Sequence, residues 1–211
     1  MIRDLLLTVC GVSLGIILLQ FVRLLLEPRA SKKRGMILYH TAVHEAGHAL
    51  VVLNSNHVES TLDTVTTVQD GDSSGRVAYS LKGLPAVVQW ELAIVALGGA
   101  AGEHVGRGKV DPPACKSDLG DALVKAREIA ATHKVEPLAV HDTVLNVQSF
   151  YKEQLDPFVL GALNICMSEA IRRVRENESD FYRLVNVLLE RRELTGLQVK
   201  EVLSRSYYER V

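Results

Sequence analysis

Two histidines and a glutamate are spaced so that they can bind a metal ion and use it to activate water. His44, Glu45 and His48 form the pattern H-E-x-x-H within HTAVHEAGHALVVL, residues 40–53. Residues four apart share one face of a helix, so both imidazoles can reach one ion. Zinc accepts such nitrogen ligands, and Glu45 can take a proton from the water that the metal activates. The sequence predicts His44 and His48 as zinc ligands and Glu45 as the general base.

A catalytic zinc site has three protein ligands, so a third is expected downstream. The metzincin continuation of the motif needs glycine at position 51 and histidine at position 54. This chain has Val51 and Asn54, which excludes that subclass. Asp118 also has an ordinary structural interpretation, because aspartate is common at the N-cap of a helix. Spacing alone does not select among the candidates, which are Glu91, Glu103, His104, Asp111, Cys115, Asp118 and Asp121.

The elements that must position these residues are mostly helices. Apolar residues in residues 40–53 recur with helical periodicity and give that helix a broad apolar face. Two short strands are expected within Thr64–Leu81, around the turn cluster QDGDSSG. Thr195 and Gln198 fit a capping box at the start of a final helix. Other helices are predicted over residues 85–105, over 118–132 and from about 149 onward, so the fold class is mainly α with a small β-sheet.

Four segments of this chain resemble the peptidase domain of FtsH-type membrane zinc proteases. They are HEAGHAL, LGGAAGEH, SDL before a helix, and LLERRELTGLQVKEVL, and the resemblance runs from about His40 to Leu203. It implies a zincin-like fold in which the H-E-x-x-H helix is followed by a helical C-terminal region. In that family an aspartate at the SDL position completes the zinc site, which here implies Asp118. Glu103 matches an acidic residue that the family's helix carries near the site, and we expect it to orient a ligand histidine; a solvated helix end is its alternative interpretation.

The chain departs from the family in two respects. Ala100 and His104 stand where the family usually has arginine and glutamate, but the implied ligands and base do not include these positions. No Walker A motif occurs in the sequence, so the ATPase module of the family is missing. The resemblance therefore implies a peptidase that acts on unfolded or flexible polypeptides. It leaves open a homo-oligomer and a separate ATPase partner that delivers substrates.

An apolar run near the N-terminus predicts a membrane anchor. Leu5–Leu26 spans roughly 33 Å as a helix, enough for a hydrocarbon core of about 30 Å. Arg29, Lys32, Lys33 and Arg34 follow it, so the positive-inside rule places the domain in the cytoplasm. A cleaved signal peptide, the alternative, has a shorter apolar core and a basic leader. The expected organisation is a transmembrane anchor at 1–27, a basic linker at 28–39 and a peptidase domain at 40–211.

Composition narrows the range of possible functions further. The net charge of −1 and the aromatic content of 5% are unlike those of nucleic-acid-binding proteins. Cys10, Cys115 and Cys166 are scattered and odd in number, which indicates unpaired thiols in a reducing compartment. The expected protein is a single-pass, membrane-anchored zinc metalloendopeptidase that contacts the lipid bilayer and polypeptide substrates.

Two other functions compete with this one. The first is a non-catalytic membrane adaptor that retains the peptidase fold, although an intact Glu45 argues against it. The second is a structural zinc protein, in which Cys115 or His104 supplies a fourth ligand and closes the site. The occupant of the fourth position distinguishes a catalytic from a structural site.

Overall fold

The computed structural model describes residues 35–68, 75–139 and 144–208. It divides the chain into two units, Met1–Leu38 and Tyr39–Val211. The predicted transmembrane run Leu5–Leu26, and the predicted linker as far as residue 34, lie outside the described residues. The fold described below is that of the second unit, together with the first residues of the helix that leads into it.

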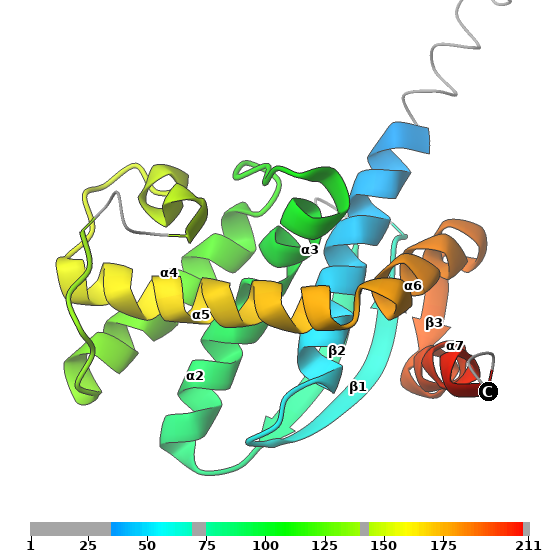
Figure 1. Cartoon of the computed structure of the whole chain (residues 1–211), viewed down its shortest axis with the longest axis horizontal. Coiled ribbons are helices and arrows are strands. Elements are labelled where there is room, and N and C mark those ends of the chain that lie inside the picture. The colour runs from blue at the N-terminus through cyan, green and yellow to red at the C-terminus, as the bar shows by residue number, and fades with distance from the viewer. Residues whose placement is uncertain (1–34, 69–74, 140–143, 209–211) are drawn as a thin grey trace, which may run out of the picture. The chain divides into compact units, whose positions relative to one another are not determined.

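The described elements are mainly helices with one small sheet (Figure 1). The helix that carries H-E-x-x-H covers residues 35–53, so it begins before the expected His40. The other elements are β1 (Glu59–Thr66), β2 (Arg76–Lys82), α2 (Pro85–Ala96), α3 (Gly98–Arg107), α4 (Lys116–Thr132), the 3₁₀ segment η2 (Val144–Phe150), α5 (Pro157–Glu176), α6 (Glu178–Arg191), β3 (Glu193–Thr195) and α7 (Gly196–Tyr208). The predicted fold class, mainly α with a small sheet, is confirmed.

The three strands form an antiparallel sheet in the order β2-β1-β3. The two strands expected within residues 64–81 are β1 and β2, and both extend beyond the expected range. β3 was not expected, because a three-residue strand between two helices has no periodicity to detect. Among the described strands β2 pairs with β1 alone, so β2 lies at an edge of the sheet.

The single helix expected over residues 85–105 is two helices. The α-helical ladder stops after α2 and starts again with α3, with Leu97 as the turn between them. Glycine tolerates such a break because it lacks a Cβ, and Gly98 and Gly99 follow it directly. The break lies where this segment crosses the helix at 35–53. There a Cβ added to Gly47 would be 2.3 Å from the Gly98 carbonyl oxygen, so the two backbones touch.

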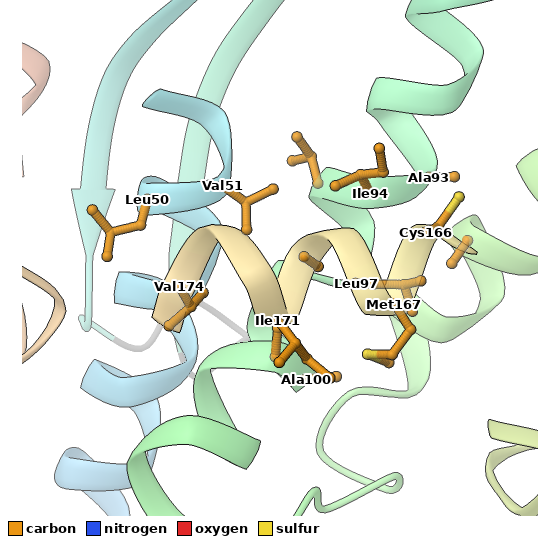
Figure 2. Close-up of a cluster of buried hydrophobic side chains, with 14 of the residues drawn as sticks. Leu50, Val51, Ala93, Ile94, Leu97, Ala100, Cys166, Met167, Ile171 and Val174 are labelled. Carbon is orange, nitrogen blue, oxygen red and sulfur yellow. The ribbon is translucent and has the colours of Figure 1, made fainter. Parts of the chain in front are cut away.

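Helix α5 packs across this crossing (Figure 2). Its Met167, Ile171 and Val174 lie against side chains of the helix at 35–53 and of α2–α3. Arg173 of α5 is also buried, and its guanidinium forms two hydrogen bonds to Glu91 of α2, at 2.7 and 2.8 Å. The same guanidinium donates to the Val51 carbonyl at 3.2 Å. These contacts fix the H-E-x-x-H helix relative to α2, and they assign Glu91 to an ion pair rather than to a metal site.

One described segment, Pro85–Arg107, is long and apolar enough to cross a membrane. In this fold, however, 56% of its most apolar window is buried inside the domain. Its two carboxylates, Glu91 and Glu103, are buried and have partners on other elements. These are the contacts of a core element, and this segment is not the one that the sequence predicts as an anchor.

The C-terminal region is helical, as expected, with interruptions that the sequence did not predict. Within η2, Leu145 and Asn146 have left-handed backbone conformations, with φ of 55° and 49°. The capping box of the last helix is confirmed. Gln198 N–H donates to the Thr195 hydroxyl at 3.3 Å, and Thr195 N–H donates to the Gln198 side-chain carbonyl at 2.8 Å. The last helix begins one residue later than expected, because Thr195 ends β3.

Candidate metal centre

The structure brings the two motif histidines and Asp118 together. His44 and His48 lie one turn apart on the helix at 35–53, and Asp118 lies in the first turn of α4. His44 Nε2 is 2.9 Å from Asp118 Oδ2 and 3.1 Å from His48 Nε2. His48 Nε2 is 3.4 Å from the same Asp118 oxygen. These three side chains form a group that could hold a metal ion.

The separations of these three atoms suit a tetrahedral ion. Zinc lies about 2.0–2.1 Å from nitrogen and oxygen ligands, so two ligands at a tetrahedral angle are about 3.3–3.4 Å apart. The observed separations are 2.9, 3.1 and 3.4 Å. An ion can therefore bind all three atoms after side-chain shifts of a few tenths of an ångström.

The other nitrogen of each ring is already held. His44 Nδ1 donates to Glu103 Oε1 at 3.1 Å, and His48 Nδ1 donates to the Val95 carbonyl at 2.7 Å. A neutral imidazole that donates through Nδ1 presents a lone pair at Nε2. Two lone pairs and the carboxylate of Asp118 thus converge on one point, and this arrangement could hold a cation.

The protonation of His44 supports this electrostatic argument. Burial lowers the pKa of His44, but its contacts with Asp118, Cys115 and Glu103 outweigh burial and raise it well above its usual value. The pKa of Asp118 is correspondingly lowered, since its hydrogen bonds with His44 and His48 outweigh the effect of burial. Both shifts reflect the attraction between the imidazole rings and the carboxylates around them.

Glu103 holds His44 from inside the fold. Its side chain is only 2% exposed, so the interpretation as a solvated helix end is wrong. Its Oε2 accepts the Asp111 backbone N–H at 2.7 Å and an Arg107 guanidinium N–H at 3.3 Å, while its Oε1 accepts the Cys115 thiol at 3.4 Å. Burial raises the pKa of Glu103, but its hydrogen bonds with His44, the Asp111 backbone N–H and Cys115, together with the charge of His44, outweigh burial and lower it. The carboxylate therefore stays ionised and fixes His44 in the tautomer that a metal needs.

Replacing Glu103 with glutamine is expected to lower the affinity for zinc about 10–100-fold, as is typical when the partner of a ligand histidine is changed. Zinc competition against a chromogenic chelator measures this change. The matched control is Glu128→Gln on α4, where the carboxylate is solvent-exposed and pairs with Lys125. Equal zinc affinities in the two variants would remove Glu103 from the metal centre.

Glu45 is buried beside the ligands. Its side chain is 5% exposed, and burial, the largest effect, raises the pKa of its carboxyl above the usual value. The charges of His48 and His44 oppose this rise. Gly75, just before β2, lies against Glu45, and a Cβ added there would be 2.5 Å from Glu45 Oε1. A carboxyl group with a raised pKa suits proton transfer near neutral pH.

The remaining candidate ligands lie elsewhere. Cys115 Sγ contacts His44 on the Nδ1 side, at 3.7 Å, where it forms a second group with Glu103 that could hold a metal. A metal ion in that second group would need His44 Nδ1, which already donates a hydrogen bond to Glu103. His104 accepts a hydrogen bond from Arg175 at 3.0 Å, and Asp111 contributes its backbone N–H to Glu103. Asp121 belongs to neither group.

The N-cap interpretation of Asp118 is wrong. Cys115 is the N-cap of α4, and the Asp118 side chain faces the two imidazoles from the first helical turn. Sequence reasoning also missed the Val95 carbonyl, which holds His48. A backbone group has no signature in the sequence, and the paired glycines after Leu97 were the only nearby signal.

Comparison with known proteins adds no family assignment. No protein-family model matches the chain, and no curated protein matches it. The functional argument therefore rests on the geometry of the candidate metal centre.

Proposed function

We propose that this chain is a zinc metalloendopeptidase that hydrolyses peptide bonds in unfolded or flexible polypeptides. One observation carries the proposal. His44 Nε2, His48 Nε2 and Asp118 Oδ2 converge within 3.4 Å, while both Nδ1 atoms are held by acceptors. The buried Glu45 on the same helix supplies the base, and the resemblance to the FtsH-type peptidase domain supports a zincin-like fold.

The number of protein ligands favours a catalytic over a structural site. A structural zinc ion has four protein ligands, whereas a catalytic one has three and an open position. In the group that contains both Nε2 atoms, Asp118 is the only further ligand among the described residues. Cys115 lies on the opposite side of the His44 ring, and His104 is engaged with Arg175. Neither residue closes the site.

In the proposed reaction Glu45 moves a proton between two positions. When bound, the zinc ion supplies a Lewis acid that makes water acidic near pH 7 and polarises a carbonyl. Glu45 accepts a proton from water as the water oxygen attacks the carbonyl carbon of the scissile bond. As the C–N bond breaks, Glu45 returns that proton to the leaving amine nitrogen. Glu103 and the Val95 carbonyl keep His44 and His48 oriented throughout.

The position of β2 supports an extended substrate. Among the described strands β2 pairs with β1 alone, and Gly75, the residue before β2, lies beside Glu45. A peptide that adds to such an edge gains backbone hydrogen bonds without any requirement on its sequence. This mode of binding suits an endopeptidase that accepts many unfolded chains.

The proposed substrates are unfolded because a peptide bond buried in a folded domain cannot reach the metal centre. Opening a folded domain globally costs about 5–15 kcal/mol, and reacting atoms must come within about 3–3.5 Å. The chain therefore cuts flexible segments itself, or receives substrates from a separate ATPase subunit. Assembly of several copies of the chain is compatible with either route.

Metal removal tests the proposed function directly. The purified chain should degrade casein, lose this activity after treatment with a chelator, and regain it with about one equivalent of zinc per chain. Magnesium should not restore the activity, because it prefers oxygen ligands in an octahedral arrangement. Casein hydrolysis that persists in metal-free protein would contradict the proposal.

The proposal includes a single-pass membrane anchor at residues 1–27 with the peptidase domain in the cytoplasm. The basic cluster after Leu26 is the reason, since cytoplasmic flanks carry an excess of lysine and arginine. A fluorescent protein fused after Val211 should fold and fluoresce, and alkaline phosphatase at the same position should be inactive. The reverse pattern would place the domain outside the cytoplasm.

A further inference from the structure

Gly99, in the first turn of α3, lies against the metal-binding atoms of both histidines. A Cβ built on Gly99 would be 2.3 Å from His44 Nε2 and 2.6 Å from His48 Nε2. Real Cβ atoms essentially never come within 3.0 Å of another heavy atom in this way. Any side chain at position 99 would therefore displace one or both imidazole rings.

The backbone just before Gly99 also contacts the site. The helical ladder is interrupted at Leu97, and the Val95 carbonyl, in the last turn of α2, accepts the His48 Nδ1–H at 2.7 Å. A Cβ on Gly98 would be 2.9 Å from His48 Cα, so this junction lies directly on the H-E-x-x-H helix. The α2–α3 junction thus holds one nitrogen of His48, and Gly99 lies directly against the other.

We propose that Gly99 is a positioning residue of the metal centre. Its missing side chain lets both rings direct Nε2 at the ion while Nδ1 stays on Glu103 in one ring and on the Val95 carbonyl in the other. A methyl group at Gly99 would rotate the rings, and the rings cannot rotate without losing these anchors. The inference rests on the proposed metal site and adds a residue that offers no ligand atom.

The contacts of Gly99 differ from those of the neighbouring glycines. A Cβ on Gly47 or Gly102 would meet backbone oxygens, those of Gly98 and Val43, at 2.3 and 2.5 Å. Those glycines are needed for helix packing, and replacing them separates two backbones. The nearest atoms to a Cβ on Gly99 are ring atoms at the far ends of side chains, which can swing aside. The Gly99→Ala variant should therefore keep its fold but bind metal more weakly than the wild type.

Three variants of the 211-residue chain in detergent test this inference, each measured for thermal stability without metal and for zinc and cobalt binding. Gly99→Ala should keep most of the metal-free melting temperature, lose at least tenfold in zinc affinity, and lose the visible absorption of tetrahedral cobalt. Gly120→Ala is the control, because nothing lies within 4 Å of a Cβ there on α4. It should bind both metals like the wild type. Gly47→Ala should lower the metal-free melting temperature sharply.

The outcomes separate this inference from the proposed function. Wild-type zinc affinity and cobalt absorption in Gly99→Ala would overturn the inference and leave the metal site intact. A loss of metal-free stability in Gly99→Ala as large as that in Gly47→Ala would also overturn it, since Gly99 would then serve packing. Failure of the wild-type chain to bind zinc would instead overturn the proposed metal site itself.

Discussion

Replacing Glu45 with glutamine is expected to abolish nearly all peptide hydrolysis while zinc remains bound. Glutamine is close to glutamate in size, so the buried side chain can keep its place, but it cannot accept a proton from water. General base catalysis typically contributes about 10²–10⁴-fold, and a loss of that size is expected. The variant should retain about one zinc per chain, because His44, His48 and Asp118 are unchanged.

Casein degradation by wild type and Glu45→Gln, measured side by side with zinc content, tests this expectation. Glu201→Gln on α7 is a suitable control, because its side chain is exposed and far along the chain from the motif. It should keep wild-type activity. Turnover that is unchanged in Glu45→Gln would mean that another residue is the base, or that a contaminating protease was measured. Loss of zinc as well as activity would show that Glu45 acts through the structure of the site.

Replacing Asp118 with alanine is expected to remove zinc from the chain. The carboxylate contributes one of three ligand atoms and the only formal negative charge among them. Changing the outer partner of a ligand costs about 10–100-fold in affinity, so loss of a ligand itself should cost more than about 100-fold. Zinc retained after dialysis, and competition with a chromogenic chelator, measure the effect.

Asp121→Ala is the matched control for this experiment. Asp121 lies three residues further along α4, is exposed, and belongs to no described group that could hold a metal. The control removes the same charge from the same helix but removes no ligand atom. It should therefore retain zinc and activity. Full zinc occupancy and full activity in Asp118→Ala would exclude Asp118 from the metal centre. Equal losses in both variants would indicate a general effect of negative charge on α4.

The parts of the candidate site that the sequence predicted are those that depend on local periodicity. His44 and His48 lie on one helical face because they are four residues apart, and no tertiary contact is needed to know this. The same holds for the capping box of Thr195 and Gln198, in which each partner is three residues from the other. The predicted mainly helical fold with a small sheet follows from periodicity of the same kind.

Spacing in the sequence did not identify the third ligand, since seven downstream residues offered suitable atoms. The resemblance to the FtsH-type peptidase domain implied Asp118, and the fold brings that residue to the histidines across 74 positions of the chain. In the same fold, Glu91 forms hydrogen bonds with Arg173, and His104 forms one with Arg175. Such choices depend on how helices cross, and the crossing depends on contacts between residues far apart in the sequence.

The break between α2 and α3 was decided by tertiary structure alone. Local periodicity favours one continuous helix over residues 85–105, and the two glycines only permit an interruption. His48, which is 47 residues earlier in the chain, donates a hydrogen bond to the Val95 carbonyl. The Gly47 and Gly98 backbones meet at the same crossing. The sequence by itself determined that His44 and His48 share one helical face, where both can reach one ion. The packing of two backbones decided where the groups that orient these two histidines lie. A carbonyl oxygen and a missing side chain leave no pattern in the sequence from which their positions could be predicted.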